Sequence, residues 1–186
     1  MMCADFTWLA RLNSMASIFG SMPPLITPAP IRRWVSPTVS VEYDVARFEA
    51  QAGTALGLPH GDWRRVQALA VAVELYTGDY LADMPVDWAQ ERRQALSALH
   101  VEVRRAYADE LIKLTRYAEA REVITRALAI EPFRDDLHER MLYCLAGLGR
   151  RHEIIDHYRR YRDLLRVELG IDPSPALRTL YARLIE

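Results

Sequence analysis

The amino-acid sequence predicts an all-α protein in which about seven helices stack as antiparallel hairpins. From Tyr43 onward, apolar residues recur at three- and four-residue spacing, which is the period of a helix with one buried face. Gly and Pro residues fall near the expected helix ends, and a shift of 34 residues aligns part of the chain with itself. No alternating strand pattern of useful length follows residue 42. These observations favour helices throughout this part of the chain.

The first two expected helices form a pair. The first runs from about Asp44 to Leu56 and ends at Gly57, with a proline two residues further on. The second starts after Asp62, whose side chain can cap its first free N–H groups, and stops at Gly78. Its apolar stripe consists of Val66, Leu69, Val73 and Tyr76.

A long third helix is expected from Trp88 to about Leu114. Asp87 can serve as its N-cap, and Gln90 stands where the partner of a capping box belongs. Apolar residues recur along it at helical spacing, which predicts a core-facing stripe rather than a ligand site. The stripe consists of Trp88, Leu96, Leu99, Val103, Tyr107, Leu111 and Leu114.

Four further helices are expected, over about 118–130, 135–148 and 152–169 and from residue 174 onward. Residues that end helices separate them, because Pro cannot continue a helix and Gly can adopt the left-handed cap. Together with Gly78, these punctuating residues are Pro132, Gly149, Gly170, Pro173 and Pro175.

The N-terminal part of the chain differs from the rest. Five prolines between residues 23 and 37 break any helix into short pieces. We therefore expect two parts: a Pro-rich tail or linker over residues 1–42, with one short helix near 6–19, and a helical domain over 43–186. Residues 35–41 could form a short strand.

An internal repeat supports the hairpin arrangement. The 34-residue shift places Leu111 on Leu145 and Glu119 on Glu153, and this is the length of a tetratricopeptide hairpin. Ala120, Ala127 and Pro132 occupy the small and terminal-proline positions of that repeat, with Ile124 at the large one. A single hairpin cannot bury its apolar face, so hairpins stack in a right-handed array and create a surface that suits peptides or protein partners.

Composition and charge narrow the functional classes. The chain has 24 basic and 25 acidic residues, and its formal net charge is −1. This balance does not favour a nucleic-acid-binding surface that extends over the whole chain. No apolar run is long enough to span a membrane, and residues 6–19 make a poor secretory signal. Cys3 and Cys144 lie far apart, which is typical of a reduced cytoplasmic protein.

One helix carries a candidate contact surface for a protein partner. His152, Arg159, Arg162 and Arg166 lie along one face of the expected 152–169 helix, with Arg151 beside them. Such a face could bind acidic protein segments or phosphates. The alternative is an ordinary solvated face, because Asp156 and Arg160, and likewise Arg159 and Asp163, are four residues apart and could pair.

We expect no enzyme, no metal and no cofactor. Several aspartates precede or follow the second helix, at Asp62, Asp79, Asp83 and Asp87, but their spacing fits no calcium loop. The chain has no Gly-rich phosphate loop, and its His-Glu pair is not part of an HExxH motif. Cys144 lies on the apolar side of its helix, which favours a buried thiol over a nucleophile.

Four aromatic residues could in principle stack on single-stranded nucleic acid. Trp63 and Trp88 stand near helix starts, and Tyr158 and Tyr161 share a stripe with Ile154. Because the two tyrosines follow the inward-facing stripe, packing is the better interpretation, and we expect a structural role for them.

Three ordered segments resemble one known family. They are LYTGDYLADMPVDWAQERRQAL (75–96), RYAEAREVITRALAIEPFRDDLHERMLYCLAGLGRR (116–151) and YRRYRDLLRVELGIDPSP (158–175), and YDVARFEA (43–50) resembles the entry to the same domain. Together they resemble the bacterial transcriptional activator domain, the tetratricopeptide-like helical part of the antibiotic regulatory protein family. The resemblance covers about residues 43–186.

The resemblance implies a helical bundle that works beside a DNA-binding winged-helix domain. Such a bundle mediates self-association or contact with the transcription machinery, so the implied partner is a second copy, another regulator domain or RNA polymerase. The 42 residues before Tyr43 are too few for a complete winged helix, so we do not expect this chain to bind DNA by itself. Either the regulator is naturally short or its gene model begins inside a longer one. The alternative function is a general tetratricopeptide adaptor without a transcriptional role.

Overall fold

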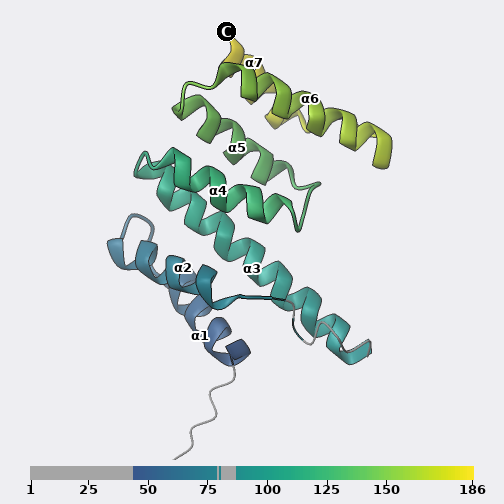
Figure 1. The fold of residues 1–186 in the computed structure, drawn as a ribbon. Helices are drawn as coiled ribbons and strands as arrows, with labels where there is room; N and C mark the ends of the chain where they lie inside the picture. Colours follow the sequence, from purple (N-terminus) through teal and green to yellow (C-terminus); the bar gives the residue numbers. More distant parts are fainter. Residues whose placement is uncertain (1–43, 79, 81–86) are drawn as a thin grey trace, which may run out of the picture. The chain divides into compact units, whose positions relative to one another are not determined.

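The computed structural model describes residues 44–78, 80 and 87–186, and for Trp88 the backbone only. The expected tail over 1–42, with its short helix and strand, lies outside the described residues. The described residues form seven α-helices, which confirms the all-α fold (Figure 1). They are α1 (Asp44–Gly57), α2 (Trp63–Leu75), α3 (Asp87–Lys113), α4 (Tyr117–Leu128), α5 (Asp135–Gly147), α6 (Arg151–Glu168) and α7 (Pro175–Ile185).

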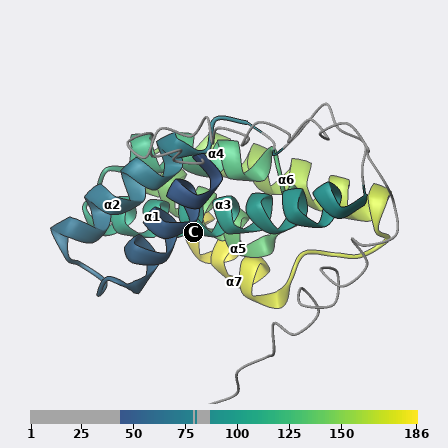
Figure 2. The ribbon, with the colours of Figure 1, turned by 90° about the horizontal axis from the view of Figure 1, so that it is seen from below.

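The helices pack in sequential pairs. Each helix contacts the next one in the chain, and in addition α1 packs on α3, α3 on α5, and α5 on α7. The even helices do not pack on one another in this way. Figure 2 shows the consequence for the C-terminal helices: α4 and α6 lie on one side and α5 and α7 on the other. We call the row formed by α1, α3, α5 and α7 the odd-helix face.

Two hydrophobic clusters meet at α3. Leu96, Val103 and Ala106 of this helix pack with α1 and α2, whereas Val101 and Leu111 pack with the helices that follow. α3 joins the two clusters, because one of its sides packs on α1 and α2 and another packs on the helices that follow. This explains why α3 is the longest of the described helices, at 27 residues.

The expected stripe along α3 is only partly correct. Leu96, Val103 and Leu111 are buried and Leu99 and Tyr107 are half-buried, but Leu114 is 51% exposed. Leu114 lies beyond the last helical residue, Lys113, where the chain turns toward α4 and away from the core. The side chain of Trp88 lies outside the described residues. The stripe also omits the polar residues that α3 buries, which are His100, Arg104 and Glu110.

The small residues at the repeat positions of α4 lie in the core. Ala120, Ile124 and Ala127 are fully buried on α4. A further close approach was not expected: a Cβ atom on Gly147 would lie 2.5 Å from the ring of Tyr117. The end of α5 and the start of α4 can therefore touch only because residue 147 has no side chain.

The helix ends follow the expected chemistry with two exceptions, at Asp87 and Gly78. The Asp62 carboxylate accepts a hydrogen bond from the N–H of Arg64 (2.8 Å), and the Ser174 hydroxyl accepts from Leu177 (3.3 Å). α3 begins at Asp87 itself, so this acid lies in the first turn. Gly149 and Gly170 adopt the left-handed conformation, with φ of 69° and 67°, but Gly78 does not.

The 34-residue repeat holds for the backbone of two turns. The N–H of Arg116 donates to the carbonyl of Leu111, and the N–H of Arg150 donates to that of Leu145, both at 2.9 Å. The preceding residues, Thr115 and Gly149, are both left-handed, with φ of 58° and 69°. Each turn is followed by an ion pair at matching positions, Arg116 with Glu119 and Arg150 with Glu153. The two turns therefore have the same structure but different residues at the strained position.

Exchanging these two residues should change stability in opposite directions. A residue with a Cβ atom is strained at positive φ, so Thr115→Gly should raise the free energy of unfolding by up to about 1 kcal/mol. Gly149→Thr should lower it by about 1 to 2 kcal/mol. No atom lies within 4 Å of a Cβ added at Gly149, so the loss would come from the backbone alone. Urea unfolding of both variants checks this, and a loss of stability on Thr115→Gly would contradict it.

Candidate partner-binding surfaces

The described residues do not bring together a metal site. No three His, Cys, Asp or Glu side chains among them are arranged to hold a metal ion. Cys144 is fully buried, as predicted, and burial raises the pKa of its thiol to about 12. A thiol that stays protonated and inaccessible does not act as a nucleophile. In this part of the chain, no helix is both long and apolar enough to cross a bilayer.

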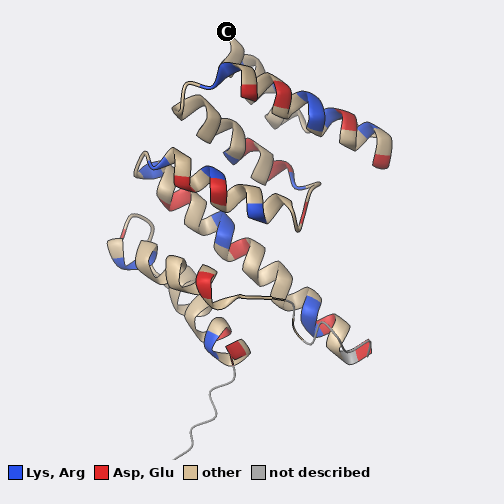
Figure 3. Ribbon diagram, viewed as in Figure 1, with Lys and Arg blue, Asp and Glu red and all other residues tan. Residues whose placement is uncertain are grey.

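The basic residues predicted on α6 lie on its outer side. We call Arg151, His152, Arg159, Arg162 and Arg166 the α6 basic face. The helix turns Ile154, Tyr161 and Leu165 into the core, which leaves these five side chains exposed or half-exposed on the other side. Figure 3 shows that acidic residues are interspersed with the basic ones along the helix.

Only part of the positive charge on this face is paired. Arg162 pairs with Asp163 (2.7 Å), and Arg166 pairs with Asp172 (2.8 Å). The expected pairing at four-residue spacing does not form, because Asp163 is bound by its neighbour Arg162. Arg160 donates from Nε to the main-chain oxygen of Asp156 instead of the carboxylate (3.2 Å).

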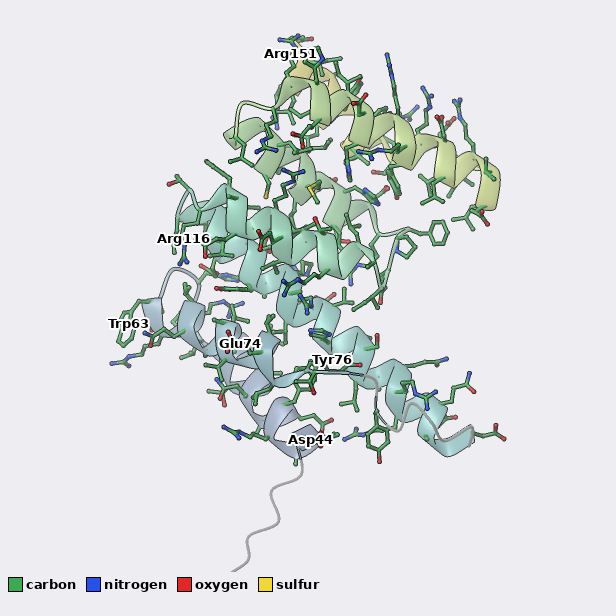
Figure 4. The ribbon with its side chains drawn as sticks, in the orientation of Figure 1. Asp44, Trp63, Glu74, Tyr76, Arg116 and Arg151 are labelled. Atoms are coloured by element: carbon green, nitrogen blue, oxygen red, sulfur yellow. The ribbon has the colours of Figure 1, made fainter. Side chains whose placement is uncertain are left out.

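Three members of the face have no polar partner. The side chains of Arg151, His152 and Arg159 form no hydrogen bond or ion pair with any residue that the structure describes. Arg151 is labelled in Figure 4 at the start of α6. These side chains can therefore bind a partner without breaking an internal contact.

The last helix adds a basic residue that the sequence did not reveal. The rings of Tyr158 on α6 and Tyr181 on α7 stack with centroids 3.9 Å apart. Burial raises the pKa of Tyr158, and the nearby charges of Arg178 and Arg162 partly offset this. Arg178 of α7 thus lies close to the α6 basic face. Only the packing of α7 on α6 brings it there.

The two tyrosines are packed in the bundle as expected, whereas Trp63 is exposed. Tyr161 is 2% exposed, and Tyr158 is half-buried in its stack. Trp63 is 63% exposed and extends away from the bundle at the start of α2 (Figure 4). It lies in the first turn of a helix that turns Leu69 and Ala72 inward, and the guanidinium of Arg64 lies over its ring, 5.8 Å from the ring centroid.

A groove crosses the odd-helix face. One hollow of about 340 Å³ lies between α3 and α5, and a second of about 420 Å³ lies between α5 and α7. Both are lined by Glu139 and Tyr143 of α5, so they adjoin each other. We call the two hollows together the odd-face groove. Its residues come from three helices that are far apart in sequence, and for this reason no local motif reveals it.

Charged residues fix α3 against α5 beside this groove. Arg140 of α5 donates two hydrogen bonds to the Asp109 carboxylate of α3, at 2.6 and 3.0 Å. Arg134 contacts Glu102 of α3 at 2.6 Å and Asp136 at 2.7 Å. Burial alone would raise the pKa of Glu102, but hydrogen bonds from Arg134 and Arg105 lower it overall. The lowered pKa keeps Glu102 ionised, and these ion pairs hold the two helices in one arrangement.

The chain matches one known protein family over most of its length. The model of the family described as "Bacterial transcriptional activator domain" matches residues 43–185. This range contains all seven described helices.

Two curated proteins are similar in sequence. Regulatory protein AfsR of Streptomyces coelicolor is 31% identical over 143 residues, which is 77% of this chain and 14% of that protein. Regulatory protein AfsR of Streptomyces griseus is 32% identical over 111 residues, which is 60% of this chain and 11% of that protein. The chain therefore corresponds to a small part of these much longer regulators.

A similar fold occurs in a solved structure of a mycobacterial protein. It is Mycobacterium tuberculosis EmbR in complex with a low-affinity phosphopeptide, with a TM-score of 0.63 and 24% sequence identity. The similarity covers 76% of this chain and 37% of EmbR. At this identity the likeness concerns the fold alone.

Proposed function

This chain belongs to the bacterial transcriptional activator domain family, a family of regulatory rather than catalytic domains, and we propose that it is the protein-interaction module of a cytoplasmic transcriptional regulator. In this role it binds a second copy of itself, another regulator domain or RNA polymerase. The observation that carries the proposal is the family match over residues 43–185. Direct DNA binding is not part of the proposed role of these helices.

We propose the α6 basic face as one surface that makes this contact. Three of its five members, Arg151, His152 and Arg159, have no polar partner among the described residues. Arg178 of α7 adds a further positive charge close by. An acidic segment of a partner protein would neutralise these charges and would gain affinity and association rate from them.

A bacterial two-hybrid assay tests this role. The full chain is paired with itself and with each subunit of RNA polymerase. The signal of the double variant Arg151→Glu with Arg159→Glu is compared with that of the wild type. The variant should weaken the productive pair by about tenfold or more, because two attractive contacts become repulsive. Arg47→Glu on the exposed side of α1 is the matched control and should have no effect. Equal signals for the wild type, the double variant and the control would exclude the α6 basic face as the contact surface. The absence of a signal with every partner would contradict the proposed role.

A further inference from the structure

Arg104 of α3 carries a buried positive charge that no acid of the described helices neutralises. The residue is 8% exposed, and its Nε donates to Nε2 of His100 at 2.7 Å. Its Nη1 atom is buried and has no hydrogen-bond partner in the part of the chain that the structure describes. Burying an unpaired charge is costly, and buried arginines are normally paired with an anion. This guanidinium is therefore a candidate anion-binding group.

His100 orients the arginine but does not compensate its charge. Nε of Arg104 can only donate, so Nε2 of His100 is the acceptor and the single ring proton lies on Nδ1. Burial and the charge of Arg104 lower the pKa of His100 to about 4, so the ring is neutral at neutral pH. The ring is stacked on Tyr76, labelled in Figure 4, with centroids 4.0 Å apart. Arg104 is thus held in place before a ligand binds, which favours affinity.

A second unpaired arginine lies opposite Arg104 on the neighbouring helix. Arg104 on α3 and Arg126 on α4 are equally far in sequence from Thr115 in the turn between the helices, so the hairpin brings them side by side. Burial lowers the pKa of Arg104, and the charge of Arg126 lowers it further. Arg126 is exposed, and its side chain forms no hydrogen bond or ion pair with a described residue. An anion between the two guanidinium groups would remove their repulsion.

The acidic residues nearby leave this pair of arginines unneutralised. Glu122 precedes Arg126 by one turn of α4, but it is exposed and forms no ion pair with either arginine. Solvent screens the charge of such an exposed carboxylate. The charge of Glu74 on α2 raises the pKa of Tyr107, and Glu74 forms no ion pair with Arg104. The two positive charges therefore remain available to a ligand.

Burial and charge together define the class of ligand. Because Arg104 is only 8% exposed, a small group can reach it and a folded surface cannot. A guanidinium presents parallel N–H donors that match the oxygens of a phosphate or a carboxylate. Two positive charges are balanced by two negative charges, which a phosphate group carries near neutral pH and a single carboxylate does not. The combination favours a small dianion with several acceptor oxygens.

We propose that Arg104 and Arg126 bind a small dianionic oxyanion of the phosphate class, with His100 as the positioning residue that holds Arg104. This inference goes beyond the proposed function, because the ligand is a small anion and not a protein. The site belongs to α3 and α4, whereas the proposed protein contact belongs to α6. Either proposal can therefore fail alone.

A ³¹P NMR titration of the full chain with inorganic phosphate at constant ionic strength tests this site. The chain should bind one phosphate saturably. Arg104→Gln and Arg126→Gln should each weaken binding by about tenfold or more, because each removes a charge-assisted hydrogen bond. Arg47→Gln removes an exposed arginine of α1 as the matched control and should leave the affinity unchanged. Sulfate should displace the phosphate, whereas acetate at the same concentration should not.

Thermal unfolding in chloride and in phosphate of equal ionic strength gives a second readout. Phosphate should raise the Tm of the wild type but not that of Arg104→Gln, because a ligand stabilises only the state that binds it. In chloride, Arg104→Gln should be at least as stable as the wild type, because it removes an unpaired buried charge and the Gln amide can still donate to His100. Arg126→Gln changes an exposed side chain, so it decides the question even if Arg104→Gln fails to fold.

Four results would overturn the proposal. The first two are the absence of saturable phosphate binding by the folded wild type, and equal affinities of the wild type and Arg126→Gln. Displacement by acetate as effective as that by sulfate would contradict the phosphate class and indicate a carboxylate ligand. Loss of binding in the double variant Arg151→Glu with Arg159→Glu, with normal binding by Arg126→Gln, would assign the anion to the α6 basic face.

Discussion

Replacing Arg65 by methionine should lower the free energy of unfolding by about 3 to 5 kcal/mol, because it removes a buried positive charge beside the buried carboxylate of Glu110 and leaves main-chain oxygens without their donor. Arg65 of α2 is 4% exposed and its Nε lies 3.3 Å from Oε1 of Glu110, which is 1% exposed. Burial alone would raise the pKa of Glu110, but hydrogen bonds from His60, Lys113 and the Gly61 N–H lower it overall. The carboxylate thus remains charged in the folded chain.

Arg65 also completes the end of α1. Its Nη1 donates to the main-chain oxygens of Ala55 (3.2 Å), Leu56 (2.8 Å) and Leu58. The last carbonyls of a helix have no partner within the helix, so this side chain satisfies groups that would otherwise be buried without hydrogen bonds. Methionine fills a similar volume but supplies none of these donors.

The neighbouring residue provides the control for this substitution. Arg64 is exposed and its guanidinium only covers the ring of Trp63, so Arg64→Met should change stability by less than about 0.5 kcal/mol. Urea or thermal unfolding of both variants gives the comparison. If Arg65→Met cost no more than Arg64→Met, Arg65 would not be a central contact between α1, α2 and α3.

Acid should destabilise the fold well before its carboxylates are protonated. Burial and the nearby charge of Arg104 lower the pKa of His100 to about 4. Burial lowers the pKa of His157 to about 4, with smaller contributions from His138, Arg160 and Arg121. Both rings are therefore neutral in the folded chain at pH values where an unfolded chain would already protonate them.

Hydrogen bonds keep His138 and His100 neutral, and His157 donates to the first of them. Nε2 of His138 lies 2.9 Å from the carbonyl oxygen of Pro132, which can only accept, so this nitrogen carries the proton. Nδ1 of His138 then accepts from Nε2 of His157 at 2.9 Å. On α3, Nε2 of His100 accepts a hydrogen bond from Nε of Arg104 at 2.7 Å. A second proton on either acceptor would place two donors face to face.

The sign of the effect follows from the lowered pKa values. The stabilising contribution is fully present above about pH 6.5 and is lost as the pH falls toward 4, because only the unfolded state binds protons in that window. Between about pH 8 and pH 5 the loss is of the order of 2 kcal/mol for each ring. Urea midpoints measured across this range should fall steadily.

Two substitutions isolate the contribution of one ring. His157→Gln keeps a donor for His138 but cannot titrate, so it should flatten the pH dependence of stability by about 2 kcal/mol over the same range. His152→Gln changes an exposed histidine of the same helix and should leave the slope as it is. An unchanged slope for His157→Gln would show that this ring is not the group that titrates.

The helices could be predicted because their signals are local. Apolar spacing, the Asp62 cap and the turns at Gly149 and Gly170 each depend on residues within a few positions of one another. The 34-residue repeat was equally visible and proved correct even in the hydrogen bonds of its turns. The exposed end of the long stripe, Leu114, was misjudged because periodicity alone does not show where a helix stops.

The surfaces could be predicted only in part. The α6 basic face lies on one helix, so spacing was sufficient to place its five members, but not to find Arg178 on α7. The odd-face groove joins α3, α5 and α7 through Tyr143 and could not be read from any one segment. The buried pair of Arg65 and Glu110 is also formed between two helices, so neither residue's own segment reveals it. Charged residues in a sequence normally indicate a solvated face.

Transcript levels in the bacterium that encodes this chain test the central claim most directly. Deleting residues 44–186 in frame should change the transcription of a defined set of genes, and the wild-type chain should restore it. The double variant Arg151→Glu with Arg159→Glu, expressed at the same level and folded, should fail to restore it, whereas Arg47→Glu should succeed. Unchanged transcripts after the deletion would contradict the account of this chain as the contact-making part of a transcriptional regulator.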